Sequence, residues 1–379
     1  MDGATSIDSL RLLAGSEWAD RLIAGVRREL IDELFRHMAE GFVMTDAEGT
    51  IESVNPAFAS ITGYSQQEAI GRNPRMLQSG VHGKPFYETM WSEVTERGQW
   101  QGEIWNRRKS GEPYLQEMTI VAVKDRQGRI IHYIAFLKDI TEREKIRKDV
   151  QLTGELQRRF IREDRTNERF AIRSIYRPAQ YVSGDMFDYI WHPDSGVLFG
   201  YVVDLMGHGL ATALQIPLLH ALFRQAEAIS GCLRDKLVWI NREAVRYFHQ
   251  DTFAAAICFE LDFHRDRFVY ASGGINRFLL LSGGTMRLME VAGPFIGMSE
   301  QAGYEEHRLP LSGAAGFFFM SDGLMEMLGD TMFARWTDFE TTMQELRALA
   351  GGRIKDDATA LCVHVTEQED FGQKRRGYE

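Results

Sequence analysis

Acidic residues in the second half of the chain lie repeatedly at the ends of apolar stretches that read as β-strands. The carboxylates in these positions are Asp185, Asp188, Asp204, Asp322, Asp356 and Asp357. A single aspartate at a strand end is usually a turn or helix-capping residue. A buried carboxylate, however, is costly unless it is paired, hydrogen-bonded or bound to a metal. If these strand ends converge, they form an oxygen-rich pocket that favours Mg²⁺ or Mn²⁺ over zinc.

Glycines close to one of these aspartates indicate the same chemistry. In YVVDLMGHGLATAL, an apolar run ends at Asp204, and a helical pattern begins after Gly207 and Gly209. Glycine lets a backbone turn tightly and approach an ion or a phosphate closely. Two metal ions about 4 Å apart would activate a bridging water for attack on phosphorus. His208, between the two glycines, has two roles open to it: orienting the phosphate or a water, or a structural role in the turn.

The composition excludes several other classes of protein. The chain has 379 residues with 44% apolar and 26% charged residues, which is ordinary for a globular protein long enough for two domains. Its net charge of -10 gives no support to nucleic-acid binding. The three cysteines, Cys232, Cys258 and Cys362, fit no metal or disulfide spacing. No signal peptide begins the sequence, and no apolar run approaches the roughly 20 residues of a membrane span. We therefore expect a cytoplasmic protein that binds neither nucleic acid nor a membrane.

The pattern of strands and helices predicts an α+β protein with two domains and a helical connection. The predicted parts are an N-terminal helical segment at 1–35, a domain with an antiparallel sheet and short helices at 36–141, a linker helix at 142–164, a second domain at 165–367 and a polar tail at 368–379.

The predicted linker helix is highly charged and carries only a thin apolar stripe. The stripe consists of Ile146, Val150, Leu152, Leu156 and Phe160. So narrow a stripe suits a seam between two helices, and we expect a parallel homodimer that pairs as a coiled coil. A lone solvated helix is the alternative.

The linker ends only about 20 residues before Asp185. We therefore expect that a shift of this helix would move Asp185 relative to Asp204 and make or break a metal site.

Residues 155 to 367 resemble a metal-dependent protein phosphatase of the PPM superfamily, in its SpoIIE-type branch. Four motifs carry the resemblance in the same order as in the branch. RPAQYVSGDMFDY resembles its PA–GGD–YD segment, VVDLMGHG its D-x-x-G-H-G, SDGLME its T-D-G-x-x-E, and DDATALCV its D-D-x-T strand. The resemblance implies an αββα sandwich, two Mn²⁺ or Mg²⁺ ions, and direct attack of water on phosphoserine or phosphothreonine without a phosphoenzyme.

Carried over position by position, the resemblance assigns the metal ligands. They are the side chains of Asp185, Asp204, Asp322 and Asp356, together with the backbone carbonyl of Leu205. Whether Asp357 or Asp188 joins the site stays open. The sequence departs from the branch at Ser183, where a glycine is usual, and at Ile275, where a histidine is usual. The second departure removes any role for that histidine but leaves the metal positions intact.

Residues 36 to 141 resemble a PAS domain. The stretches that carry this resemblance are NPAFASITGYSQQEAIGRN, NRRKSGEPY and KDITERE. GRNPRMLQSG also resembles the flavin-binding LOV subgroup, but Pro74 replaces the cysteine that forms the photoadduct, so no adduct is expected. Similarity to redox-sensing PAS domains implies flavin contacts at Trp100 and Asn106. In the alternative, Trp100 is a core aromatic, and the domain binds either another small ligand in place of FAD or no ligand.

Together the two resemblances imply a signalling phosphatase like those of bacterial stress-response pathways. A PAS sensor would regulate hydrolysis of a phosphorylated protein, of the anti-sigma-factor-antagonist type. A catalytically silent module that keeps the PPM fold, senses a ligand and binds a protein is the alternative.

Overall fold

The structure is a computed structural model that describes residues 33–207, 209–229, 231–248, 252–329 and 332–366. The predicted helix at 1–35, except for its last residues, lies outside these ranges, as do His208 and the tail at 368–379. The chain divides into two compact units between Arg147 and Lys148, and each unit is described by itself. Among the helices in the described ranges, none is both long enough and apolar enough to cross a bilayer.

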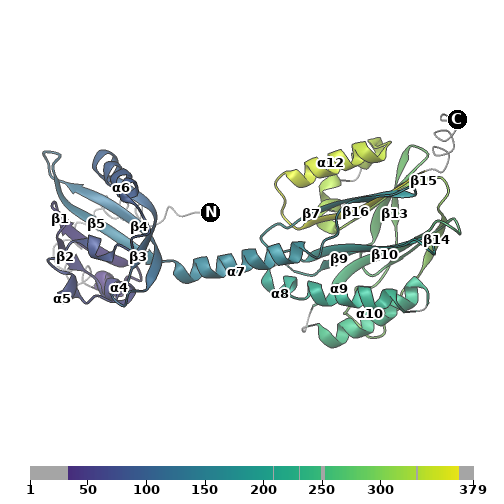
Figure 1. Cartoon of the computed structure of the whole chain (residues 1–379), viewed down its shortest axis with the longest axis horizontal. Coiled ribbons are helices and arrows are strands. Elements are labelled where there is room, and N and C mark those ends of the chain that lie inside the picture. Colours follow the sequence, from purple (N-terminus) through teal and green to yellow (C-terminus); the bar gives the residue numbers. More distant parts are fainter. Residues whose placement is uncertain (1–32, 208, 230, 249–251, 330–331, 367–379) are drawn as a thin grey trace, which may run out of the picture. The chain divides into compact units, whose positions relative to one another are not determined.

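The first unit is built on a five-stranded antiparallel sheet with the order β2-β1-β5-β4-β3 (Figure 1). Its elements are β1 (Gly41–Asp46), β2 (Ile51–Val54), α4 (Pro56–Thr62), α5 (Gln66–Ala69), η1 (Pro74–Leu77), α6 (Lys84–Arg97), β3 (Gln99–Arg107), β4 (Pro113–Lys124) and β5 (Ile130–Asp139). Helices α4 and α6 both end at a glycine in the left-handed conformation, Gly63 and Gly98. Their apolar sides pack on one face of the sheet through residues such as Phe58 and Val94.

The second unit contains two antiparallel sheets. One has the order β14-β11-β10-β9-β8 and the other β13-β12-β15-β16-β7-β6. The strands are β6 (Arg165–Thr166), β7 (Phe170–Arg177), β8 (Asp185–His192), β9 (Val197–Leu205), β10 (Ala254–Asp262), β11 (Arg267–Ser272), β12 (Arg277–Ser282), β13 (Thr285–Glu290), β14 (His307–Pro310), β15 (Ala314–Met320) and β16 (Ala358–Val365). The helices are α8 (Leu210–Ala213), α9 (Ile216–Glu227), α10 (Leu233–Tyr247), α11 (Asp322–Met325), η2 (Glu326–Leu328), η3 (Met332–Arg335) and α12 (Phe339–Gly351).

These sheets form the middle two of four layers, with α9 and α10 on one side and α12 on the other (Figure 1). The layer between the sheets is rich in aromatic residues, and the rings of Phe259 and Phe319 stack across it at 4.1 Å. Strand β9 lies inside its sheet and has apolar neighbours on both faces, which is why its sequence is nearly continuous in apolar residues. The predicted fold class is therefore confirmed: an α+β chain with an antiparallel-sheet domain and an αββα sandwich.

Helix α7 (Thr141–Arg158) joins the two units in the sequence. Its second half packs on the second unit through Gly154 and Gln157, which are buried. A side chain at position 154 would overlap the carbonyl oxygen of Tyr181, since a Cβ there would lie 1.9 Å from it. The stripe residues Leu152, Leu156 and Phe160 remain exposed, with 56%, 48% and 45% of their surface accessible. The packed face of the helix is thus made of small and polar residues, and the apolar stripe lies elsewhere.

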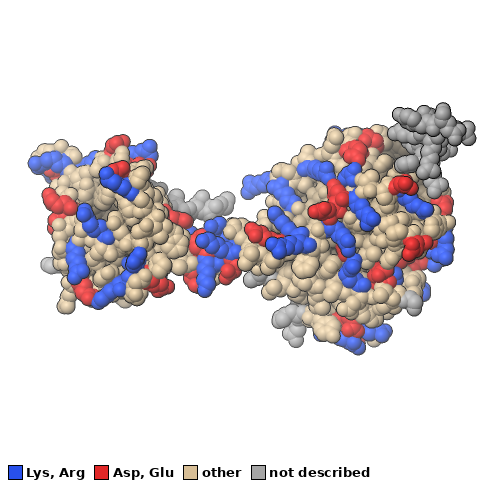
Figure 2. All heavy atoms as spheres, in the orientation of Figure 1, with Lys and Arg blue, Asp and Glu red and all other residues tan. Residues whose placement is uncertain are grey.

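Charged side chains of both signs are interspersed over the visible face of each unit (Figure 2). No continuous basic surface appears on that face.

Candidate metal centre

The predicted metal ligands come from four separate segments of the second unit, two from each sheet. Strands β8 and β9 pair so that Asp185 lies opposite Asp204. In the other sheet, β15 pairs with β16, so Asp322, just after β15, lies near Asp356, just before β16. Gly323 makes this approach possible, because a Cβ there would come within 2.2 Å of the Asp357 carbonyl oxygen and 3.2 Å of the Asp356 Cβ.

Electrostatics show that the two pairs meet. Burial raises the pKa of Asp204 to about 9, and the negative charges of Asp185, Asp322 and Asp356, with a hydrogen bond shared with Asp322, add to this increase. Burial also raises the pKa of Asp185 to about 7, although the Ser321 and Thr359 hydroxyls beside it oppose the shift. The neighbouring carboxylates therefore raise the cost of ionising Asp185 and Asp204.

The donor set fits a hard divalent cation. All four side chains offer oxygen, and Asp185, only 2% exposed, has one carboxylate oxygen, Oδ2, without a hydrogen-bond partner. A positive ion would remove both the desolvation cost and the mutual repulsion of these groups. Within the described ranges, no group of three or more acidic, histidine or cysteine side chains is arranged closely enough to hold a metal ion. The carboxylates thus converge without forming a finished coordination shell.

The backbone around Leu205 and Gly207 supplies further oxygens beside the same cluster. A Cβ at Gly184 would lie 3.0 Å from the Leu205 carbonyl oxygen and 3.1 Å from that of Gly207. Because the Leu205 side chain is buried in the core under α9, only its backbone is available to a ligand. Gly207 and Gly209 have φ angles of 90° and 97°, which other residues rarely adopt.

Two further aspartates, Asp357 and Asp188, accept hydrogen bonds from other segments of the second unit. The Asp357 carboxylate accepts hydrogen bonds from the backbone amides of Ala179 and Gly184, each at 2.7 Å, and so anchors the loop before β8. Asp188 lies three positions after Asp185, and in a strand this odd spacing places it on the opposite face. There it accepts a 2.9 Å hydrogen bond from Arg162.

Sequence analysis missed three residues that shape this site. Ser321 and Thr359 hold the strand ends together, since the Thr359 amide donates to the Ser321 hydroxyl at 3.1 Å and both hydroxyls lie beside Asp185. Gln157 reaches from α7 to Ser183, accepting from its amide at 2.9 Å and donating to its carbonyl at 2.6 Å. The motif letters around Asp322 and Asp356 already contained Ser321 and Thr359. Nothing in the charged pattern of the linker singles out Gln157.

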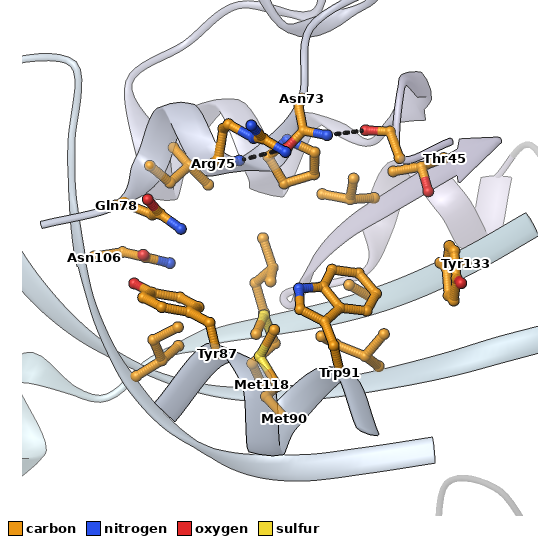
Figure 3. Close-up of a pocket in the computed structure, with 18 of the residues that line it drawn as sticks. Thr45, Asn73, Arg75, Gln78, Tyr87, Met90, Trp91, Asn106, Met118 and Tyr133 are labelled. Atoms are coloured by element: carbon orange, nitrogen blue, oxygen red, sulfur yellow. Dashed lines mark hydrogen bonds between the residues drawn. The ribbon is translucent and has the colours of Figure 1, made fainter. Parts of the chain in front are cut away.

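The first unit has a cavity of about 880 Å³ between the sheet and the helices (Figure 3). Asn106 lines it beside Gln78, whereas Trp100 does not. Trp100 instead packs over Gly102 and meets the edge of Phe86 at 6.1 Å among the core residues of this unit, and the flavin contact at Trp100 stays a prediction. The spacing could not reveal this difference, because Trp100 and Asn106 lie an even number of positions apart on β3 and are both buried.

Polar groups inside this cavity lack partners within the protein. Gln116 is completely buried, and its Oε1 atom has no hydrogen bond, as is also true of the Tyr87 hydroxyl. Around them, Met90, Met118 and Ile120 form an apolar surface (Figure 3). An apolar cavity with a few unsatisfied polar groups is typical of a small-molecule site.

Comparisons with known proteins agree with this division. Residues 39–142 match the PAS domain family, and residues 194–366 match the family "Stage II sporulation protein E (SpoIIE)". The chain therefore carries a PAS domain followed by a SpoIIE-family domain. This confirms the two resemblances that the motifs predicted.

Individual relatives match only parts of the chain. The nitrogen fixation regulatory protein of Klebsiella oxytoca is 36% identical over 123 residues, which are 31% of this chain and 25% of that protein. Phototropin-1A of rice (Oryza sativa subsp. japonica) is 28% identical over 28% of this chain and 12% of its own. The SiaA-PP2C domain of Pseudomonas aeruginosa is a solved structure with 20% identity and a TM-score of 0.49, over 60% of this chain and 99% of that one. The chain thus spans about a quarter or less of the two sequence relatives.

Replacing Asp204 by Asn should stabilise the metal-free protein at pH 8. Since the folded pKa of Asp204, about 9, lies above its unfolded value, the folded state binds more protons between about pH 4 and 9. Stability contributed by the protonated carboxyl is therefore lost as the pH rises through this window. Allowing for solvent screening, we expect Asp204→Asn to gain roughly 1 to 2 kcal/mol at pH 8, or a few degrees in Tm.

The measurement is thermal unfolding with EDTA and with Mn²⁺ at pH 5.5 and pH 8. Mn²⁺ should stabilise the wild type more at pH 8 and should stabilise Asp204→Asn much less. The control is Asp194→Asn, an exposed turn residue, which should behave as wild type. A lower Tm of Asp204→Asn in EDTA at both pH values would show that the fold needs the charge, contrary to the electrostatic analysis.

Proposed function

We propose that the chain is a PAS-regulated, metal-dependent serine/threonine protein phosphatase. The observation that carries the proposal is the convergence of Asp185, Asp204, Asp322 and Asp356 from four strand ends, with two of them forced toward their protonated forms. Such an arrangement is costly for folding, and it is accounted for when the carboxylates serve a cation. The SpoIIE-family match over residues 194–366 supports the same reading.

Some residues of the chain would bind the metal ions, and others would position the metal ligands. Asp185, Asp204, Asp322 and Asp356, with the Leu205 carbonyl, would hold two Mn²⁺ or Mg²⁺ ions. Such ions, when bound, acidify water and polarise a phosphoryl oxygen. Ser321 and Thr359 join the ends of β15 and β16 within one sheet, and their hydroxyls lie beside Asp185 of the other sheet. For His208, both alternatives remain: a structural role in the turn, or orientation of the phosphate or a water.

A catalytically silent PPM-fold module is the second candidate. A silent module would have no use for two buried carboxylates, Asp185 and Asp204, that repel each other, and replacing them by neutral residues would stabilise it. All four ligand positions are intact in this chain, which favours the enzyme. The SpoIIE-type resemblance further implies that the substrate is a phosphorylated anti-sigma-factor antagonist, and this finer identity is part of the proposal.

Regulation would pass through α7 and Gln157. The two hydrogen bonds between Gln157 and Ser183 fix the segment that leads to Asp185, and Asp357 holds the same segment through Gly184. A movement of α7 would therefore displace Asp185 relative to Asp204. This makes α7 the two-state element that such coupling needs.

The exposed stripe on α7 supports the proposal of a parallel homodimer. Leu152 and Leu156 are about half exposed on α7, off the face that packs on the second unit through Gly154 and Gln157. Phe160, four residues after Leu156 and beyond the end of α7, is 45% exposed and its ring lies 5.9 Å from that of His220. Ile146 is 55% exposed as well. A second copy of the helix would cover this stripe.

We also propose that the PAS cavity binds a flavin such as FAD. A cavity of about 880 Å³ has room for a ring system, and Asn106, Gln78 and Gln116 offer amide groups to its polar edge. Pro74 leaves no thiol for a photoadduct. The visible absorption spectrum of the purified chain tests this proposal, and a chain that neither carries nor takes up FAD would contradict it.

The purified chain should hydrolyse p-nitrophenyl phosphate and a phosphoserine peptide only when Mn²⁺ or Mg²⁺ is present. Asp322→Asn should lower kcat by at least about 100-fold, because it removes a ligand charge but little volume. Asp194→Asn is the matched control and should keep wild-type turnover. Metal-independent turnover, or full activity of Asp322→Asn, would favour the silent module and a contaminating enzyme.

Gly154→Ala should weaken the response to metal, whereas Glu155→Ala on the exposed side of the same turn should not. Alanine favours a helix by up to about 1 kcal/mol over glycine, so harm at position 154 would come from the overlap with Tyr181. We expect the Mn²⁺ concentration for half-maximal turnover to rise several-fold in Gly154→Ala. Identical metal dependence in both variants would make α7 a passive tether.

Light scattering at micromolar concentration should give twice the mass of one chain. Leu152→Asp combined with Leu156→Asp should shift the mass to that of a monomer, because it places charge in the seam. A monomeric wild type would refute the dimer without affecting the assignment of the metal centre.

A further inference from the structure

A methionine is presented to solvent on a firmly held loop of the second unit. Met298 is 65% exposed, yet the backbone on both sides of it is fixed by one buried side chain, Asn241. The Asn241 amide accepts from the Gly297 N–H at 2.8 Å and donates to the Ser299 carbonyl at 2.8 Å. A large apolar side chain on a preorganised loop costs little conformational entropy when a partner binds it.

The same loop carries an aromatic side chain toward the candidate metal centre. The ring of Phe295 stands 4.8 Å from that of Phe253, and both are only half buried. Phe295 covers Gly274, where a Cβ would lie 2.6 Å from the ring and 3.1 Å from the Cα of Ala255. Ala255 is the residue that pairs with Asp204. Phe295 is thus separated from the Asp204 strand by a single neighbouring backbone.

Met206 continues this apolar surface to the metal centre itself. It follows Leu205 directly, is 43% exposed, and donates its backbone N–H to the Phe253 carbonyl at 2.9 Å. Met206, Phe253, Phe295 and Met298 form what is called here the apolar rim. Methionine and aromatic residues are the types most enriched in surfaces that bind other proteins.

The backbone register gives the distance between the rim and the metal centre. Leu205 pairs with Ala254, and Ala254 is bridged to Ile296 by two hydrogen bonds of 2.9 and 2.8 Å. Two steps between neighbouring strands amount to about 10 Å. An extended peptide covers that distance in about three residues.

We propose that the apolar rim selects protein substrates that carry a large aliphatic side chain about three residues from the phosphorylated serine or threonine. The proposal rests on the proposed phosphatase function, since the phosphate at the metal centre sets the register. The occupant is a protein segment and not a small phosphate ester, because Met298, two residues beyond Ile296 on the same loop, lies beyond the reach of such an ester.

The test uses the full chain with Mn²⁺ and two phosphoserine peptides that differ only three residues before and after the phosphoserine. One peptide has leucine at both positions and the other has serine. For the wild type we expect kcat/KM to be about tenfold higher for the leucine peptide. In Met298→Ser and in Phe295→Ala this ratio should fall to within about twofold.

Met298→Leu is the matched control, because it keeps an apolar side chain on the same clamped loop and should keep the tenfold ratio. Both substitutions at this exposed position should leave Tm unchanged, so loss of the fold cannot account for a difference between them. Equal kcat/KM for the two peptides in the wild type, or an unchanged ratio in Met298→Ser, would overturn the rim proposal alone. A wild type that hydrolyses neither peptide and no p-nitrophenyl phosphate would overturn the phosphatase function and the rim proposal together.

Discussion

Repulsion among carboxylates at the shared edge of two sheets is the constraint on which the second unit depends. Asp185 and Asp204 come from one sheet, and their burial limits the screening of their charges by water. Asp322 and Asp356 come from the other sheet and are exposed, but their charges act on Asp204. Bringing these groups together lowers the stability of the metal-free protein. The four-layer packing around aromatic side chains supplies enough stability elsewhere to hold them in place.

Close backbone approach is the means by which this edge is assembled. Gly184 lets the carbonyls of Leu205 and Gly207 come near, and Gly323 lets the Asp322 turn rest on the strand start at Asp356. The same requirement appears at Gly154, where α7 touches the Tyr181 carbonyl. The contact between α7 and the loop before β8 is therefore part of the same assembly as the metal centre. A signal that moves the helix would act on the ligand geometry directly.

The first unit shows a different balance between packing and binding. Its sheet and helices enclose a cavity instead of a fully packed core, and Gln116 and the Tyr87 hydroxyl inside it have no protein partner. Unsatisfied buried groups reduce stability by about 1 to 3 kcal/mol each, so a ligand that pairs with them would stabilise the unit. Such a ligand would also stabilise the sheet whose strand β5 precedes α7 in the sequence.

Sequence alone determined the fold class, the two resemblances and the ligand candidates, because strand periodicity and strand-end motifs are local properties of the chain. It also placed an apolar stripe on the linker. Only the tertiary structure decided that Asp188 faces away from Asp185 and that Asp357 binds backbone amides. Tertiary structure likewise assigned Trp100 to the core, revealed Gln157, and brought Phe295 within one backbone of the Asp204 strand. These facts depend on strand register and on contacts between segments distant in the chain, which a local pattern does not specify.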